Sequence, residues 1–155
     1  MDNSLLKDQL SRTMYGDAWH GPAVLEALEG IFVQQAINKP IADGHSVWEI
    51  ILHLTAWQEI VATLLRGQAT SPTPEQEWPI VPEPTNVAWQ TTKTHLLESH
   101  QALLKLIETL TPAQLVEPIP GRPPGQEKSK LFLLLGLVQH NVYHAGQIVL
   151  LKKML

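Results

Sequence analysis

The chain has 155 residues, of which 44% are hydrophobic and 17% charged, with 12 Pro, seven His and no Cys. Its formal net charge is −4 and it has no dense basic run, so we expect no nucleic-acid partner. The lack of Cys excludes a disulfide framework, a thiolate zinc site, an iron–sulfur cluster and a cysteine nucleophile. A chain of this length buries roughly 70% of its unfolded surface, so residues 1–155 are expected to form one domain.

The N-terminus and the apolar runs indicate a cytoplasmic protein. Asp2, Lys7 and Asp8 interrupt the N-terminus, and the apolar segment of a secretory signal does not follow them. The longest apolar run, residues 131–138, is far too short to span a bilayer. We therefore expect neither secretion nor a membrane partner.

Proline and glycine divide the first half of the chain into predicted helices. Residues 5–10 are amphipathic and predict a short extra helix that stops near residues 15–17. The first long helix is predicted from Gly21-Pro22 to about Ile37, because proline suits a first helical turn and apolar residues then recur at helical spacing.

A capping box marks the start of the second long helix. Ser46 is the expected cap and Glu49 the residue that reaches back to it, and the helix should run to about Arg66 and close at Gly67. The proline-rich segment 68–84 cannot be helical throughout.

Two more long helices complete an all-α four-helix bundle. They are predicted over residues 85–110 and from about residue 128 to the C-terminus, separated by a Pro- and Gly-rich loop over 112–126. Alternating strand patterns are absent over any useful length. The segment 68–84 reaches about 55 Å when extended, so both an up-and-down and an overhand topology remain open.

The last helix carries two apolar stripes. The first holds two of the histidines, and its members are Leu133, Leu137, His140, His144, Gln147, Ile148 and Leu151. The second has the spacing of a coiled-coil seam, and its members are Leu131, Leu135, Val138, Val142, Ala145 and Val149. A bundle helix needs one apolar stripe, so we predict a homodimer through the second. The alternative is that the N-terminal helix covers it within one chain.

His140 and His144 lie one helical turn apart, the spacing with which one helix can hold a metal ion. Alone, such a pair is better explained by two partly buried polar side chains with local hydrogen bonds. His53, however, lies on the apolar face of the second helix, at a similar depth if the two helices are antiparallel. Three inward imidazoles repel one another when protonated and need partners when neutral, and a divalent metal ion answers both requirements.

A three-histidine set leaves coordination positions open, as catalytic sites do. Zinc is the expected ion, with nickel, iron and manganese as alternatives.

Five other residues are candidates near this site. Glu49 is either a general base beside the metal or, as we favour, only the partner of the Ser46 cap. Gln147 could orient a ligand, Tyr143 could donate to a substrate, Trp57 could wall the pocket and His100 could line it. The remaining histidines and tryptophans are expected in loops, on the surface or as core anchors: His20, His45, His95, Trp19, Trp48, Trp78 and Trp89.

Three segments carry a recognisable pattern. Residues 46–54 read SVWEIILHL, residues 140–148 read HNVYHAGQI with the spacing H-x-x-x-H-x-G-Q-I, and residues 19–22 read WHGP. In these segments the chain resembles the DinB-like family, the DinB and YfiT group of bacterial four-helix-bundle metalloproteins. The resemblance touches three of the four predicted helices and leaves the loops unmatched.

The resemblance implies the overhand (up-down-down-up) connection between the second and third helices, homodimers, and a metal site formed here by His53, His140 and His144. It also implies a metal-dependent enzyme that uses a low-molecular-weight thiol, most simply an S-transferase acting on a small-molecule substrate. A metal-dependent hydrolase is the nearest alternative, and a non-catalytic dimeric helical binding or structural protein is the alternative from another class. Substrate choice is expected to lie in the loops 68–84 and 112–126.

Overall fold

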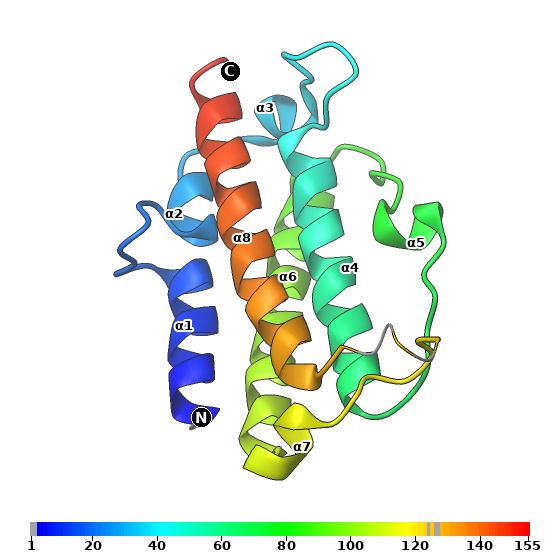
Figure 1. The fold of residues 1–155 in the computed structure, drawn as a ribbon. Helices are drawn as coiled ribbons and strands as arrows, with labels where there is room; N and C mark the ends of the chain where they lie inside the picture. Colours follow the sequence, from blue (N-terminus) through cyan, green and yellow to red (C-terminus); the bar gives the residue numbers. More distant parts are fainter. Residues whose placement is uncertain (1–2, 124, 126–127) are drawn as a thin grey trace.

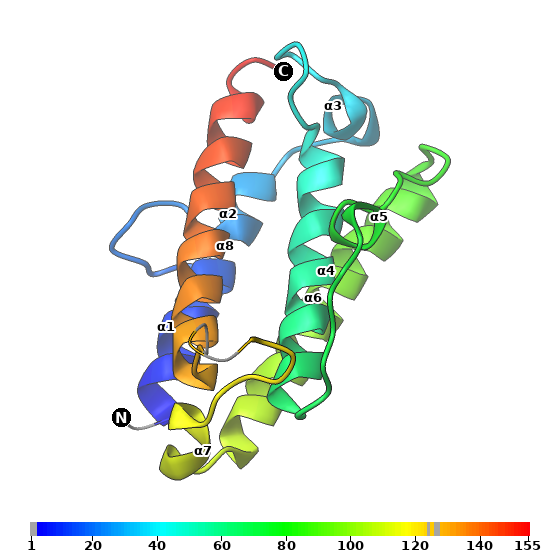
Figure 2. The same cartoon turned by 45° about the vertical axis from the view of Figure 1, so that its right-hand side comes forward.

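The chain folds into helices packed around a common core (Figures 1 and 2). The computed structural model describes residues 3–123, 125 and 128–155. Its helices are α1 (Asn3–Tyr15), α2 (Val24–Leu28), α3 (Val33–Ile37), α4 (Val47–Leu65), α5 (Pro74–Glu77), α6 (Asn86–Thr109), α7 (Pro112–Val116) and α8 (Lys130–Lys152). Within the described residues the only β pairing is one isolated bridge between Pro118 and Ser129, so the predicted all-α class is confirmed. None of the described helices is long and apolar enough to cross a membrane.

The two central helices, α4 and α6, run in the same direction. Near their starts, the Trp48 indole Nε1 donates to Thr92 Oγ1 at 3.0 Å. About ten residues farther along α4, Ser99 Oγ of α6 donates to Gln58 Oε1 at 3.2 Å. Because residue numbers rise together along both helices, α4 and α6 are parallel, and the segment between them returns along the length of the bundle (Figure 1).

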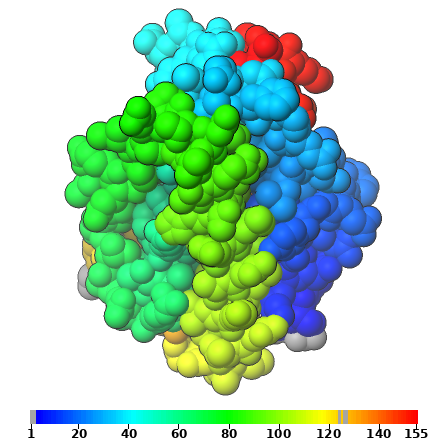
Figure 3. All heavy atoms as spheres, turned by 180° about the vertical axis from the view of Figure 1, so that it is seen from behind, coloured from blue at the N-terminus to red at the C-terminus, as the bar shows by residue number. Residues whose placement is uncertain are grey.

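Helices α1 and α8 run in the opposite direction. Asn141 Nδ2 of α8 donates to Thr13 Oγ1 of α1 at 3.0 Å. At the start of α1, Asn3 Nδ2 donates to the carbonyl of Ile107 near the end of α6 at 3.0 Å. The directions are therefore up for α1 and α8 and down for α4 and α6. Seen from behind, α6 lies between the N-terminal segment and the segment that follows α4 (Figure 3).

The predicted first long helix, from residue 22 to about 37, is wrong. The structure has two short helices there, α2 and α3, separated by Gly30 at φ +73°. Glycine reaches this left-handed conformation without the steric cost that a side chain would add, and it weakens a helix interior. The break still buries Leu28 and Ile31, and it frees the Ile31 carbonyl to accept from the Trp89 indole at 3.2 Å. The apolar spacing therefore correctly predicted that Leu28 and Ile31 are buried, but it did not predict that the helix is interrupted at Gly30.

The N-terminal helix is a member of the bundle rather than a short extra. Helix α1 packs on both α6 and α8, and α2 continues beside α8 above it (Figure 2). Leu6, Leu10 and Met14 of α1 are all buried. Together α1 and α2 occupy the place that the single predicted helix was expected to fill.

Each of the other long helices begins after a capping side chain, of which Ser46 was predicted. Ser46 accepts from the backbone N–H of Glu49 at the start of α4, and Thr85 and Ser129 cap α6 and α8 in the same way. Gly67, at φ +83°, follows the end of α4, as predicted. These caps make the predicted bounds of α4 and α6 accurate to about one residue.

The core consists of two apolar clusters separated by buried polar side chains. One cluster contains Trp48, Trp89 and Ile148, and the other contains Leu10, Leu103 and Leu134. Between them along the four long helices lies a set that we call the polar layer, which comprises Thr13, Gln58, His100 and Asn141. Each of α1, α4, α6 and α8 contributes one of these four residues, and all four are at most 2% exposed.

Candidate metal centre

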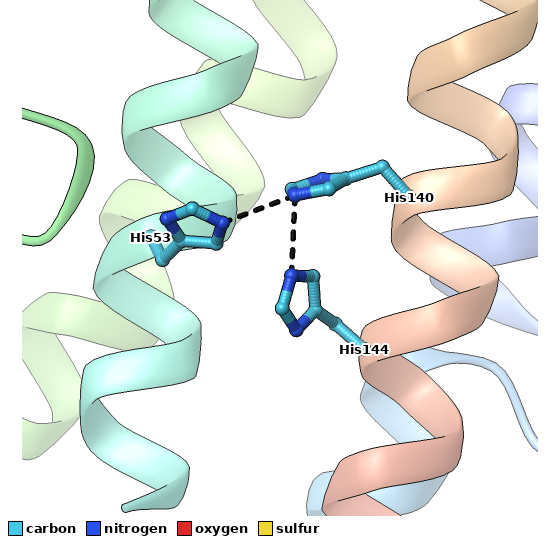
Figure 4. Close-up of side chains that lie close together, drawn as sticks. All are labelled: His53, His140 and His144. Atoms are coloured by element: carbon cyan, nitrogen blue, oxygen red, sulfur yellow. Dashed lines mark hydrogen bonds between the residues drawn. The ribbon is translucent and has the colours of Figure 1, made fainter. Parts of the chain in front are cut away.

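Three histidines from two antiparallel helices converge on one point (Figure 4). His53 extends from α4, and His140 and His144 extend from successive turns of α8. The Nε2 atom of His140 lies 3.1 Å from Nε2 of His53 and 3.1 Å from Nε2 of His144. One nitrogen from each ring therefore belongs to a group of three potential ligand atoms that lie within 4.8 Å of one another.

The outer nitrogens of two of these rings are held by oxygen acceptors. His53 Nδ1 lies 2.6 Å from the backbone carbonyl of Glu77, and His144 Nδ1 lies 2.6 Å from Gln147 Oε1. Because a carbonyl oxygen only accepts, each Nδ1 carries the proton and donates it. The Nε2 atoms of both rings are then unprotonated, with their lone pairs directed at the centre.

Burial keeps the three imidazoles neutral. His53 and His144 are 6% and 4% exposed. Burial, with smaller contributions from the neighbouring His144 and His53, lowers the pKa of His140 to about 3. Burial also lowers the pKa of His144 to about 4, against the hydrogen bond to Gln147, and it lowers the pKa of His53. Neutral imidazole is the form that ligates a metal ion.

These three residues fit a divalent metal ion. Tetrahedral zinc with Zn–N bonds of about 2.0–2.1 Å places its nitrogen ligands roughly 3.3 Å from one another. This is close to the 3.1 Å that separates the Nε2 atom of His140 from that of His53 and from that of His144. Without a cation, a proton on His140 Nε2 could be donated to only one of the two neighbouring Nε2 lone pairs, and the other lone pair would lack a partner. The set is all nitrogen, which suits zinc and other divalent transition metals better than magnesium or calcium.

The three histidines lie in a pocket of about 590 Å³ with largely apolar walls. Its lining residues are His45, His53, Trp57, Val61, Glu77, Trp78, Phe132, Leu133, Gly136, Leu137, His140, Tyr143, His144 and Gln147. Among these described residues none is Lys or Arg, and four are Trp, Phe or Tyr. Such walls exclude water and favour an uncharged or aromatic molecule beside the centre.

Three of the predicted pocket residues lie beside the histidines. Trp57 stands edge-on to His53 and His140, with ring centroids 6.3 and 5.9 Å away. Tyr143 is 64% exposed and stands edge-on to His144 at 5.1 Å, at the edge of the pocket. Gln147 is the acceptor that orients His144.

Glu49 lies outside the pocket. Its Oε2 accepts from the backbone N–H of Ser46 at 2.7 Å, and its Oε1 pairs with Lys39 Nζ at 2.7 Å. Partial burial raises the pKa of Glu49, but the hydrogen bonds from Lys39 and Ser46 outweigh it and the net shift is downward. The carboxylate is thus engaged in capping α4, the alternative that the sequence favoured.

His100 does not line the pocket, and its suggested role there is wrong. It is fully buried in the polar layer, where the Tyr15 ring meets it edge-on at 5.4 Å. Neither ring nitrogen has a hydrogen-bond partner among the described residues. The helical spacing of α6 correctly placed His100 inside the bundle, but its neighbour is α1 rather than the pocket.

Sequence reasoning missed three residues that surround His53. Trp78 stacks on His53, His45 stacks on Trp78, and the Glu77 carbonyl holds His53 Nδ1. The sequence contains a pattern that could have located Glu77 and Trp78. Thr73 and Pro74 form a helix start, which predicts a helical turn that ends near Trp78.

Of the two loops expected to select the substrate, one supplies residues to the pocket and the other supplies none among its described residues. The segment 68–84 contains α5 and supplies Glu77 and Trp78 to the pocket. The segment 112–126 contains α7, and none of its described residues lines the pocket. Residues 124 and 126 of that segment lie outside the described residues.

Comparison with known proteins gives one family. A model of the DinB superfamily matches residues 18–148, a range that contains all three histidines of the centre and begins after α1. No curated protein matches the chain significantly.

Proposed function

The chain belongs to the DinB superfamily, and from that premise we propose that it is a metal-dependent enzyme centred on His53, His140 and His144. The observation that carries the proposal is the convergence of three neutral imidazoles in an apolar pocket, two of them with unprotonated Nε2 atoms directed at the Nε2 of the third. A purely structural metal is usually enclosed by four protein ligands, whereas three ligands beside an open pocket leave a position for a substrate.

The activity we propose is thiol-dependent S-transfer with zinc as the ion, and nickel, iron and manganese as alternatives. A divalent ion held by three imidazoles favours the thiolate form of a bound thiol, which is the stronger nucleophile. The chain has no Cys, so the thiol is a low-molecular-weight cosubstrate. In the transfer its S–H proton is lost to solvent, and sulfur forms a bond to an electrophilic carbon. The leaving group departs with the electron pair of the broken bond.

The side chains of the pocket bind and orient the reactants. Trp57 and Phe132 provide apolar walls for the electrophile and keep water from competing with the thiol. Tyr143, at the exposed edge, is placed to donate a hydrogen bond to a substrate oxygen or to the leaving group. Glu77 presents its backbone carbonyl to His53 and therefore acts on the ligand rather than on the substrate.

The proposed activity is tested with zinc-loaded protein, an aromatic chloro-substituted electrophile and a panel of bacterial thiols. Conjugation that requires both metal and one thiol, and that His140→Ala abolishes, supports S-transfer. Hydrolysis of ester or amide substrates without any thiol would instead establish the hydrolase. Metal retention with neither activity across both panels would contradict catalysis and leave a structural or binding role.

We also propose that the protein is a homodimer through α8. Side chains on its outer face remain exposed, with Leu135 at 40% and Leu150 at 55%. Helices α1 and α2 pack on α8 and partly cover the predicted seam, in which Ala145 is 1% exposed. Analytical ultracentrifugation should show a dimer at micromolar concentration that Leu135→Glu dissociates. A monomeric wild-type protein would contradict this.

A further inference from the structure

Three aromatic rings from three separate segments form one stack against the metal centre. The Trp78 ring lies parallel to the His53 imidazole, with centroids 3.8 Å apart and an interplanar angle of 10°. It lies equally parallel to His45, at 3.5 Å and 7°. Two imidazoles cannot occupy the same face at these separations, so Trp78 is held between His45 on one face and His53 on the other.

His53 is restrained at an edge and on a face by two consecutive residues. The Glu77 carbonyl accepts the Nδ1 proton at 2.6 Å, which restricts rotation of the ring in its plane. Trp78 covers one face of the ring and restricts tilting. His144 has the acceptor Gln147 at its Nδ1, and His140 has no Nδ1 partner in the part of the chain that the structure describes. Trp78 also meets the His144 ring edge-on, at 6.2 Å, but the acceptor of His144 Nδ1 lies on α8, whereas the acceptor of His53 Nδ1 comes from a segment outside α4 and α8.

The backbone of that segment is fixed locally. Thr73 caps α5 by accepting from the Gln76 N–H, and Pro74 occupies the first helical position. The backbone N–H groups of Glu77 and Trp78 donate to the carbonyls of Thr73 and Pro74 at 3.0 and 2.9 Å. The single turn therefore delivers the Glu77 carbonyl and the Trp78 ring together, as one unit.

We propose that Glu77, through its carbonyl, and Trp78 are positioning residues for the metal ligand His53, so that metal binding and the seating of residues 73–78 stabilise each other. The inference rests on the proposed metal centre. An imidazole already aimed at the centre loses less freedom when it binds the ion. Linkage is reciprocal, so whatever the seated turn adds to metal affinity, the bound metal adds to the seating of the turn.

The first test compares zinc and cobalt affinity by competition with a chromophoric chelator in Trp78→Leu, Trp78→Phe and Ile80→Ala. Loss of an outer partner of a ligating histidine typically weakens metal binding by about 10- to 100-fold, the range we expect for Trp78→Leu. Trp78→Phe retains a ring to stack on and should recover most of the affinity. Ile80, which is 90% exposed in the same segment, is the matched control and should leave the affinity unchanged.

The visible spectrum of the cobalt-loaded protein reports the ligand geometry itself. Trp78→Leu should alter the d–d bands and Trp78→Phe should restore them, whereas loss of general stability alone would leave the bands of the folded fraction unchanged. Equal affinity and identical spectra for Trp78→Leu and wild type would overturn the inference while the metal centre stands. A wild-type protein that binds no metal would contradict the proposed function as well.

A second test needs no substitution. Amide hydrogen exchange of the wild-type chain should slow at Gln76, Glu77 and Trp78 when zinc is added. Helix α7 provides an internal control, since Thr111 and Pro112 start it with the same cap as Thr73 and Pro74 and it lies outside the pocket. Exchange in α7 should not change. Equal rates in α5 with and without saturating zinc would overturn the inference.

Discussion

The bundle buries histidine in two contrasting regions. In the metal centre, His53 and His144 each donate Nδ1 to an oxygen and direct Nε2 at His140. In the polar layer, His100 is fully buried, and neither of its nitrogens has a hydrogen-bond partner within residues 3–123, 125 and 128–155. Burial lowers the pKa of both His100 and His144 to about 4. Neither burial nor the pKa therefore distinguishes a ligand from a core histidine.

What distinguishes the two regions is the direction of the nitrogens. A metal centre needs several unprotonated nitrogens aimed at one point, with the opposite nitrogen fixed by an acceptor. His100 has neither feature, although the polar layer contains three other polar side chains. Variants of both regions can test whether this distinction has energetic consequences.

The largest expected effect is a difference in zinc affinity between variants of the metal centre and a variant of the polar layer. Replacing His53, His140 or His144 by Ala removes one of three ligand nitrogens. Because loss of only an outer partner of a ligand weakens metal binding by up to about 100-fold, zinc binding should weaken by more than this. His100→Leu should bind zinc with wild-type affinity. Isothermal titration of chelator-treated proteins measures both. Comparable losses at His100 and His140 would remove the distinction between the two regions.

The second effect is a pH dependence of stability that comes from His100. Its pKa is about 4 in the folded chain, against an ordinary value of 6.5. Between these values the unfolded chain binds a proton that the folded chain does not, so stability falls as the pH falls through this window. The full difference is about 3 kcal/mol.

His100→Leu removes that titrating group and should make the folded chain less sensitive to acid than the wild type. Urea unfolding of both proteins at pH 7 and pH 4.5, with a chelator present, gives the comparison. Contributions from the other histidines are common to both proteins and cancel in the difference. An equal loss of stability in both proteins would show that His100 is protonated in the folded state.

The third effect concerns Gln147, which accepts from His144 Nδ1 in the metal centre. Among the described residues His100 has no such acceptor. Gln147→Leu removes the partner of His144 Nδ1 and frees the ring to rotate and to exchange tautomers. Zinc affinity should fall about 10- to 100-fold, and Gln147→Glu, which keeps an acceptor oxygen, should retain it. Chelator competition checks this. Wild-type affinity in Gln147→Leu would mean that packing alone orients His144.

The smallest effect tests whether the two regions are independent. Thr13→Val leaves Asn141 Nδ2 without its acceptor and should destabilise the fold by about 1–3 kcal/mol. Although Asn141 is adjacent to His140 in sequence, zinc affinity should change less than twofold, because the two side chains point to different sides of α8. A large change in affinity would show that the polar layer supports the centre.

Much of the centre could be predicted from helical geometry. The cap at Ser46 locates the start of α4, apolar periodicity locates α6, and the spacing of His140 and His144 places both rings on one face of α8. His53 then follows from its depth along an antiparallel neighbour. These predictions succeeded because long helices have one regular geometry.

The remainder depends on chain segments without such regularity. Gly30 interrupts a stretch whose apolar spacing predicts one continuous helix. Apolar spacing shows which side chains are buried, and these can be buried equally well by two short helices. Trp78 and His45 reach the centre from loops, whose paths are set by tertiary contacts that single-residue patterns do not encode. The topology was open for the same reason, since the 68–84 segment was long enough for either connection.

The central claim is that three imidazoles hold one metal ion, and X-ray absorption of the zinc-loaded protein tests it most directly. The account predicts one zinc per chain with about three imidazole ligands at 2.0–2.1 Å and no protein sulfur. In His140→Ala the number of imidazoles should fall by one in any zinc that remains bound. A wild-type spectrum with one imidazole or none would contradict the account.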